Sequence, residues 1–384
     1  MKINILNKIL ISMFLVFIAC IFNVRARGLD ISAKSGILIC ADTGSVVWSK
    51  DPDRYMTMAS TTNIMTAVLA LEYILAHGDK EIEITPNMIQ VEGTSMGLTS
   101  GDIINLSSLV TGMMLCSGND AANAISIAVS GDTRKFVKLM NEKARLLNMS
   151  NTKFCTPSGL DKDDHHSCAR DMAILGAYAM ENEEFSNIVC QKSAKIKFIN
   201  PNKTISYKNH NKLLRLYKYC TGIKTGFTKL SGRCLVSSAQ KDGIKLICVT
   251  LNASNDWDDH MNLYNYGFEN TILKNYSDEN FRANLKIKNS DKEQISVGSV
   301  ENFTVSLKSG EENLVTREVN LPDIYDSPVR KNQILGTVKY YLNNKIIGEN
   351  KIIALEDCVE IKHKKSSFFE SIINFFRIFL GFQN

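Results

Sequence analysis

Three short polar motifs in this chain contain the residue types that acyl transfer to water requires. Such a reaction needs a nucleophile, a base that activates it, a proton donor for the leaving group and a site that stabilises an oxyanion. Ser60 opens the first motif, Ser-Thr-Thr-Asn, and we expect it at the start of a helix, where the helix dipole favours developing negative charge. Asn63 follows one helical turn later, so its side chain is expected to reach the serine and hydrogen-bond it.

The second and third motifs add polar groups that could complete such a site. In the second, Ser-Gly-Asn, Ser117 and Asn119 lie on a predicted turn between helices, from which both side chains could point into a cleft. In the third, Lys224 and Thr225 head a predicted strand, where the lysine could hold a substrate carboxylate and Gly226 would let substrate approach the backbone. Each motif alone is common, and a serine at a helix start is more often only an N-cap.

Hydrophobic periodicity predicts the elements that must position these motifs. Strands are expected at both ends of the first 250 or so residues, with helices between them, which is typical of one α+β domain. Gly78 is the expected stop of the helix that follows Ser60. The other expected elements are a hairpin over 36–48, helices over 106–114 and 136–148, a hairpin over 234–251 and a closing helix over 257–268.

The remainder of the chain has a different texture. Short alternating strands begin near residue 277, and Asn343 and Asn344 form an expected hairpin turn between 338–342 and 346–348. The pattern predicts a carboxyl-side all-β domain over 275–361, after a larger domain over 27–274. Residues 362–384 begin with a basic cluster and continue as an amphipathic pattern typical of a helix lying in a membrane interface. The alternative is a helix packed on the body of the protein.

The first 26 residues have the pattern of a secretory signal peptide. Lys2 and Lys8 precede or flank an apolar core over 9–18, and Val24 and Ala26 supply small residues for cleavage. An uncleaved anchor and a lipoprotein site at Cys20 are the alternatives. We therefore expect an exported protein.

Composition and spacing exclude several classes of function. The net charge is only +5, and no basic stripe is interleaved with aromatic residues, so we expect no nucleic-acid partner. The ten cysteines are scattered without a C-x-x-C pair, which disfavours structural zinc. Asp164, His165 and His166 adjoin in a polar stretch that is more typical of a solvated loop than of a metal site. We expect neither metal nor cofactor.

In order and spacing, the three motifs resemble the S-x-x-K, S-x-N and K-T-G set of the serine penicillin-recognising enzymes. The resemblance covers nearly the whole mature chain and points to the low-molecular-mass penicillin-binding proteins of the D-alanyl-D-alanine carboxypeptidase family. It implies a β-lactamase/transpeptidase-like domain with an antiparallel sheet and a flanking helical region, then the small β-domain and the terminal helix. Short sequence segments that resemble those of the family also occur at 41–44, 96–98, 117–122, 157–160, 169–173 and 222–229.

The resemblance also implies roles for the motif residues. Ser60 would attack the penultimate D-alanine carbonyl of a peptidoglycan stem pentapeptide, and β-lactams would acylate the same serine. Ser117 and Asn119 would relay a proton and hold the substrate amide, while Lys224 and Thr225 would bind the terminal carboxylate. The protein would be periplasmic and tethered to the outer face of the cytoplasmic membrane by its terminal helix.

One residue departs from the family pattern, because Asn63 stands where the lysine base is expected. An amide cannot serve as a base at physiological pH. Three interpretations stay open: an impaired enzyme that still binds wall peptides, Lys224 acting as the base through Ser117, or a sequence error, since Lys and Asn codons differ only at the third base. A class A β-lactamase and a non-catalytic wall-binding protein are the alternative functions.

Overall fold

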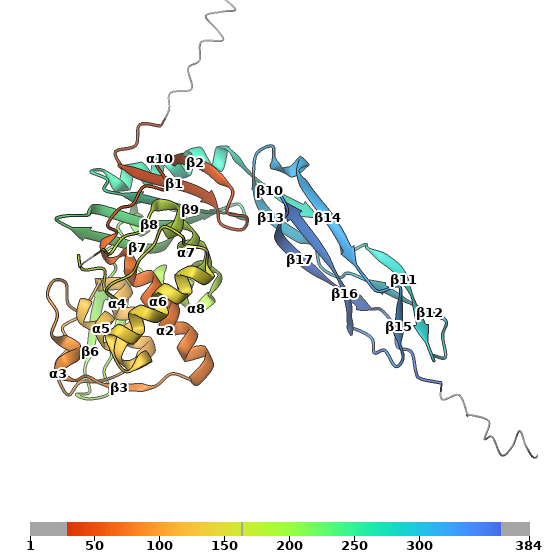
Figure 1. Cartoon of the computed structure of the whole chain (residues 1–384), viewed down its shortest axis with the longest axis horizontal. Helices are drawn as coiled ribbons and strands as arrows, with labels where there is room; N and C mark the ends of the chain where they lie inside the picture. The colour runs from red at the N-terminus through yellow and green to blue at the C-terminus, as the bar shows by residue number, and fades with distance from the viewer. Residues whose placement is uncertain (1–28, 163, 362–384) are drawn as a thin grey trace, which may run out of the picture. The chain divides into compact units, whose positions relative to one another are not determined.

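The computed structural model describes residues 29–162 and 164–361. The chain forms two compact units that divide between Asn270 and Thr271 (Figure 1). The predicted signal peptide, 1–26, and the predicted anchor helix, 362–384, lie outside the described residues.

The first unit is built on a five-stranded antiparallel sheet with the strand order β2-β1-β9-β8-β7. The hairpins predicted over 36–48 and 234–251 are confirmed as the β1–β2 and β8–β9 pairs. The Lys-Thr-Gly motif lies on β7, at one edge of the sheet. The strands are β1 (Ser35–Cys40), β2 (Val46–Lys50), β7 (Cys220–Thr228), β8 (Gly232–Lys241) and β9 (Ile244–Leu251).

Both faces of this sheet are covered, so its central strands are largely apolar. In β1, Ile37 and Ile39 join the core on the side of the helical region, while Leu38 and Cys40 join the core beneath α10 (Asp256–Glu269). Successive side chains of a strand point to opposite faces, which explains this division. Figure 1 shows α10 on one face and α7 on the other.

The helical region contains the elements that carry the first two motifs. The helices predicted after Ser60, over 106–114 and over 136–148 are confirmed, and Gly78 caps the first of them with a φ of 85°. Its elements are η1 (Ala59–Thr62), α2 (Asn63–His77), β3 (Glu81–Glu83), α3 (Pro86–Ile89), β4 (Ile103–Asn105), α4 (Leu106–Cys116), α5 (Asn119–Ser130), α6 (Thr133–Leu146), α7 (Ala169–Glu181), α8 (Glu183–Val189), β5 (Ser193–Lys197), β6 (Thr204–Lys208) and α9 (Leu213–Leu216).

The segment Ala59–His77, which comprises η1 and α2, is long and apolar enough to cross a membrane. However, 67% of its most apolar window is buried inside the protein. A helix that is hydrophobic on all sides is expected at the centre of a large core, and this is the role of α2 here.

The second unit is made of β-strands, as predicted. A six-stranded sheet has the order β14-β16-β17-β12-β11-β15, and β10 pairs with β13 beside it. The predicted turn at Asn343 and Asn344 joins β16 to β17, with φ values of 51° and 64° that suit a tight hairpin. Its elements are β10 (Thr271–Tyr276), β11 (Arg282–Lys288), β12 (Gln294–Gly298), β13 (Phe303–Lys308), η2 (Glu311–Asn313), β14 (Val315–Asn320), β15 (Ile324–Asp326), β16 (Ile334–Leu342) and β17 (Lys345–Ala354).

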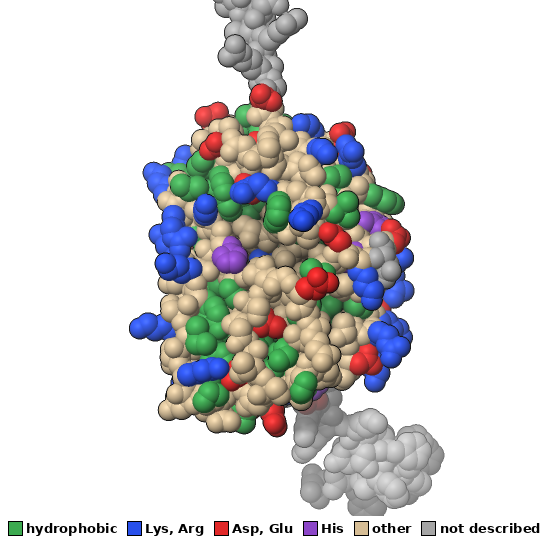
Figure 2. Space-filling model, turned by 90° about the vertical axis from the view of Figure 1, so that its left-hand side faces the viewer, with side chains coloured by type: hydrophobic (Ala, Val, Ile, Leu, Met, Phe, Trp, Pro, Cys, Tyr) green, Lys and Arg blue, Asp and Glu red, His purple; other side chains and the backbone are tan. Residues whose placement is uncertain are grey.

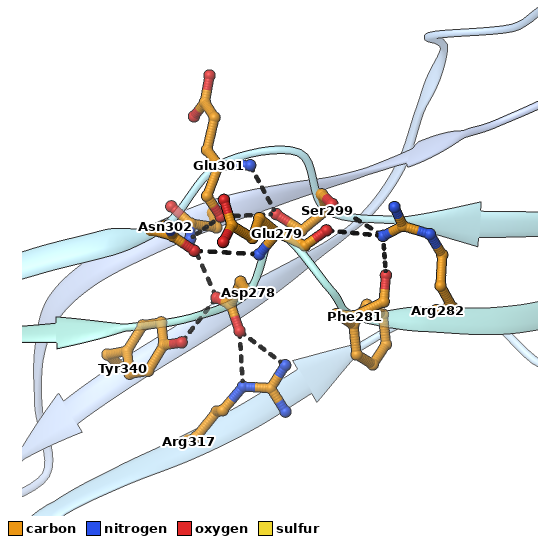
Figure 3. Close-up of polar contacts among 10 residues, drawn as sticks. Asp278, Glu279, Phe281, Arg282, Ser299, Glu301, Asn302, Arg317 and Tyr340 are labelled. Carbon is orange, nitrogen blue, oxygen red and sulfur yellow. Dashed lines mark hydrogen bonds and ion pairs between the residues drawn. The ribbon is translucent and has the colours of Figure 1, made fainter.

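A buried carboxylate joins the strands of this second unit (Figure 3). Asp278, just after β10, accepts hydrogen bonds from Arg317 Nη2 at 2.9 Å, Tyr340 Oη at 2.6 Å and Asn350 Nδ2 at 3.0 Å. The Arg317 guanidinium lies over the Phe281 ring. A buried charge is tolerated when it is paired and hydrogen-bonded, so this network is a structural one that ties β14, β16 and β17 together.

Candidate active site

A cleft of about 300 Å³ in the first unit brings the three motifs together. Ser60 comes from η1, Ser117 from the turn between α4 and α5, and Thr225 from β7. Figure 2 shows a hollow in the middle of one face of this unit, with basic side chains and a histidine beside it, which agrees with the lining. The lining residues are Ser60, Thr94, Ser117, His210, Lys212, Thr225, Gly226, Phe227, Arg233, Asp256 and Trp257.

Ser60 was predicted at the start of a helix. It lies instead in the 3₁₀ turn η1, and α2 begins only at Asn63. Ala59 precedes it with a φ of 48°, in the left-handed region. The edge strand β7 approaches this turn closely, because a Cβ atom on Gly226 would lie 3.1 Å from Ser60 N and 2.9 Å from Met58 O. Because Gly226, in the third motif, has no side chain, the turn that carries Ser60 can pack directly against β7.

Lys224 and Ser117 are in direct contact. The Lys224 amine donates to Ser117 Oγ at 3.0 Å and to the Thr225 carbonyl at 3.0 Å. Ser117 ends α4 in the left-handed conformation, with a φ of 63°, which turns its hydroxyl toward β7. Lys224 is only 1% exposed. Ser117 and Thr225 line the cleft, whereas Lys224 is not among the described residues that line it. The amine thus lies behind Ser117.

Burial gives the Lys224 amine the properties of a base. Desolvation disfavours the ammonium form and lowers the pKa of Lys224 from 10.5 to about 7, and Cys116 opposes this only in part. A substantial fraction of this amine is therefore neutral near pH 7. A neutral amine that already contacts a hydroxyl can accept a proton from it.

Asn119 positions the wall of the cleft. Its Nδ2 donates to the Glu92 carbonyl at 2.8 Å, and its backbone N–H donates to the Thr94 carbonyl at 2.7 Å. The side chain is buried and holds the segment that contributes Thr94 to the lining. The next residue, Asp120, accepts hydrogen bonds from the backbone N–H groups of 96–98 and fixes the same segment.

Asn63 does not hydrogen-bond Ser60, and that sequence-based prediction is wrong. Its Nδ2 is oriented toward the carbonyl oxygens of Pro157 and Ser158, at 3.4 and 3.5 Å, and its buried Oδ1 has no hydrogen-bond partner among the described residues. The reason is the segment 155–162, which packs against the start of α2 and offers carbonyl groups there.

The prediction of a solvated loop at 164–166 is also wrong for His165. This residue is 3% exposed, and its ring contacts Thr62 Oγ1 at 3.0 Å. His166 instead contacts the Asp164 carboxylate at 3.0 Å, near the surface. The described residues contain no cluster of three His, Cys, Asp or Glu side chains that could hold a metal ion.

One wall of the cleft was not anticipated from the sequence. Arg233 lies opposite Phe227 in the β7–β8 pair and donates from Nε and Nη2 to Asp256 Oδ1, at 2.9 and 2.5 Å. Its guanidinium lies 5.2 Å from the centre of the Trp257 ring. Burial raises the pKa of Asp256 above its usual range, although the adjoining Arg233 opposes this. A fixed cation therefore stands on the cleft wall.

The fold and the three motifs at the cleft are those of the class of serine-type peptidase hydrolases. Residues 22–255 match the family described as D-alanyl-D-alanine carboxypeptidase, and residues 272–360 match the C-terminal domain of penicillin-binding protein 5. The chain belongs to the D-alanyl-D-alanine carboxypeptidase family, among the low-molecular-mass penicillin-binding proteins. The family that the motifs indicated is thus confirmed, as is the α+β fold with its additional β-domain.

The similarity extends over both units. D-alanyl-D-alanine carboxypeptidase DacC of Escherichia coli (strain K12) is 30% identical over 347 residues, which cover 86% of this chain and 85% of that protein. DacF of Bacillus subtilis (strain 168) is 29% identical over 342 residues, covering 87% of each. Penicillin-binding protein 5 from Haemophilus influenzae matches with a TM-score of 0.63 and 26% identity over 86% of this chain and 98% of that one.

A second solved structure resembles the first unit. The Streptomyces K15 DD-transpeptidase matches with a TM-score of 0.60 and 28% identity, covering 62% of this chain and 98% of its own. These relatives support an exported serine-type peptidase that acts in the cell wall. The match of residues 272–360 to the C-terminal domain of penicillin-binding protein 5 disfavours the β-lactamase alternative.

Proposed function

We propose that this chain removes the terminal D-alanine from peptidoglycan stem pentapeptides through an acyl-enzyme at Ser60. The observation that carries this proposal is the Lys224–Ser117 contact at 3.0 Å, at the base of the cleft that Ser60 and Thr225 line. Lys224 can act as the base, Ser117 as the hydroxyl that carries the proton and Ser60 as the nucleophile, although Asn63 replaces the usual lysine. Lys224 is then the base in this chain.

Proton transfer can pass through the contact between Lys224 and Ser117. As Ser60 Oγ attacks the carbonyl carbon of the penultimate D-alanine, its proton passes to Ser117, whose own proton passes to the neutral Lys224 amine. The C–N bond then breaks, and Ser117 returns a proton to the departing amine of D-alanine. Water cleaves the resulting ester by the reverse order of transfers and regenerates Ser60. A base with a pKa near the working pH suits this role.

The remaining groups bind and stabilise the substrate in this proposal. The backbone N–H of Ser60 and those of β7 beyond Lys224 would hold the oxyanion, which develops only during attack. Thr225 would bind the terminal carboxylate from the cleft lining. Because Lys224 must be neutral before attack to act as the base, the cationic side chain available to the terminal carboxylate on the cleft wall is Arg233, which is paired with Asp256.

A second candidate is favoured by Asn63. In this alternative the chain binds wall peptides or β-lactams in the same cleft but forms the acyl-enzyme very slowly. The observation behind it is the absence of a partner for Asn63 Oδ1 among the described residues, because the residue supports neither Ser60 nor a hydrogen-bond network. Loss of a general base costs about 10²–10⁴-fold in rate.

Acyl-enzyme formation separates the two functions. The purified chain is incubated with benzylpenicillin, and intact-mass spectrometry follows the adduct, with Ser60→Ala and Lys224→Met as matched variants. We expect an adduct on the parent chain, none on Ser60→Ala, and release of D-alanine from a peptide that ends in D-Ala-D-Ala. A parent chain that stays unmodified while it still binds the peptide supports the second candidate.

We propose that the protein acts in the periplasm, tethered to the outer face of the cytoplasmic membrane. The support is the amphipathic pattern over 366–382 behind a basic cluster, together with the signal-like segment over 1–26. Deletion of 366–382 should release the protein from membranes into the soluble fraction. Continued sedimentation of the deletion variant with membranes would rule out this tether.

A further inference from the structure

The turn that carries Ser60 is strained, and something must hold it. Ala59 has a φ of 48° although it is not a glycine, and it is fully buried. A non-glycine residue in the left-handed region costs on the order of 1–2 kcal/mol. Such a conformation persists only when the surrounding structure over-determines it, and it is often found where a catalytic group is presented.

The segment 155–167 supplies the surrounding structure. Its Gly159 has a φ of 83°, and a Cβ atom there would lie 1.9 Å from the Ala59 carbonyl oxygen, so the backbone of the segment rests directly on that carbonyl. The same carbonyl accepts a hydrogen bond from Thr62 Oγ1 at 2.8 Å. The Ala59 peptide is thus held from two sides.

His165 completes a directed series of hydrogen bonds to this carbonyl. Its Nδ1 accepts from the Cys155 backbone N–H at 2.9 Å, so a neutral ring carries its proton on Nε2. That Nε2–H donates to Thr62 Oγ1 at 3.0 Å, and the Thr62 hydroxyl in turn donates to Ala59 O. Each group thus accepts one hydrogen bond and donates the next. Moving the imidazole proton to Nδ1, for example, would place it against the Cys155 N–H, with two donors facing each other.

We propose that His165 is a positioning residue for the nucleophile: its neutral imidazole orients Thr62 and, through Ala59, fixes the turn that presents Ser60. This inference rests on the proposed role of Ser60 as the nucleophile. His165 does not line the cleft, so it acts only through Thr62.

The electrostatic surroundings keep this imidazole neutral. Burial lowers the pKa of His165 from 6.5 to about 4, the neighbouring His166 lowers it slightly further, and Asp161 opposes both. The Phe154 ring lies close by, with its centroid 6.0 Å from that of the imidazole. At pH 6–8 the ring therefore stays neutral, which the acceptor role of Nδ1 requires.

Four variants test the proposal: His165→Ala, His165→Gln, Thr62→Val and, as a matched control, the adjacent His166→Ala. A glutamine can accept from the Cys155 N–H and donate to Thr62, so it retains the polarity of the series. The readouts are hydrogen exchange of the peptides covering residues 58–66, the thermal midpoint, and the second-order rate of benzylpenicillin acylation in the full-length chain.

We expect His165→Ala to raise exchange in 58–66 and lower the acylation rate, each by about tenfold, which corresponds to one lost hydrogen bond of about 1.4 kcal/mol. His165→Gln should recover most of both, and His166→Ala should change neither. Thr62→Val should match His165→Ala, and the double variant should add nothing further, because both break the same series.

Two outcomes would overturn the proposal. One is unchanged exchange and acylation in both His165→Ala and Thr62→Val. The other is faster exchange spread evenly over the first unit with a lowered thermal midpoint, which indicates a role in general stability only. If the parent chain forms no adduct, the proposed function fails, while exchange in 58–66 still decides whether His165 holds the turn.

Discussion

Asn63 lies with its side-chain nitrogen 3.4 Å from the Pro157 carbonyl oxygen, which is a long distance for a hydrogen bond. The Ser158 carbonyl is equally distant, at 3.5 Å, and Asn63 Oδ1 is buried without a partner among the described residues. An unsatisfied buried acceptor costs about 1–3 kcal/mol. Among the described residues, the side chain at position 63 thus meets two carbonyl oxygens and no donor for its Oδ1, an arrangement that suits an ammonium group better than an amide.

Replacing Asn63 with lysine should therefore restore a base beside Ser60. Because Lys224 acts on Ser60 only through Ser117, we expect a lysine directly beside Ser60 in Asn63→Lys to raise the benzylpenicillin acylation rate, by at most the roughly 10²–10⁴-fold that a general base usually contributes. The rate is measured by intact mass against time. Asn63→Met, with similar length and no charge, is the control and should stay near the parent rate. Equal rates in the lysine variant and the parent would show that Lys224 already supplies all the base catalysis.

The acylation rate of the parent chain should depend on pH through Lys224. Its folded-state pKa of about 7 lies below the ordinary 10.5, so the neutral base form increases as pH rises through 7. We expect the rate to increase tenfold per pH unit below 7 and to level off above it. Between 7 and 10.5 the unfolded chain binds more protons at this residue, so its contribution to stability also grows with pH. A flat profile from pH 5.5 to 9 would exclude Lys224 as the base.

Gly159 and Gly131 form a matched pair for testing the serine turn. Both have positive φ, 83° and 85°, but a Cβ atom on Gly131 would meet nothing within 4 Å, whereas one on Gly159 would lie 1.9 Å from Ala59 O. Gly131→Ala should cost about 1–2 kcal/mol of stability and leave acylation unchanged. Gly159→Ala should cost more and displace Ser60, so that acylation falls at least tenfold. Thermal unfolding and the adduct rate distinguish these effects.

His260 should make the first unit sensitive to acid. It is fully buried beneath the sheet, where its ring contacts Ser237 Oγ at 2.6 Å and Thr250 Oγ1 at 2.9 Å. Burial lowers its pKa from 6.5 to about 3, so between these values the unfolded chain binds more protons and stability falls as pH decreases. Urea unfolding should show a lower midpoint at pH 4.5 than at pH 7. His260→Gln should reduce that difference, and an unchanged difference would contradict this assignment.

Local patterns were sufficient to predict most of the fold. The hairpin turns, the α2 stop at Gly78 and the all-β second unit follow from periodicity and turn residues close together in the chain. The contacts around the site depend on segments far apart instead: His165 meets Thr62 across 103 residues, and Lys224 meets Ser117 across 107. The sequence indicated that Ser60, Ser117 and Thr225 share a site. It carried no local signal that a polar loop would bury His165, or that Arg233 and Asp256 would pair on the cleft wall.

The placement of Trp257 gives the protein an intrinsic optical reporter. The chain has two tryptophans, and the other, Trp48, lies in β2 at the opposite edge of the sheet from β7. Trp257 lines the cleft, with the Arg233 guanidinium 5.2 Å from its ring centre, and a charge this close is expected to affect indole emission. In a Trp48→Phe background, fluorescence would follow ligand entry and departure in real time, independently of whether a covalent bond to Ser60 forms.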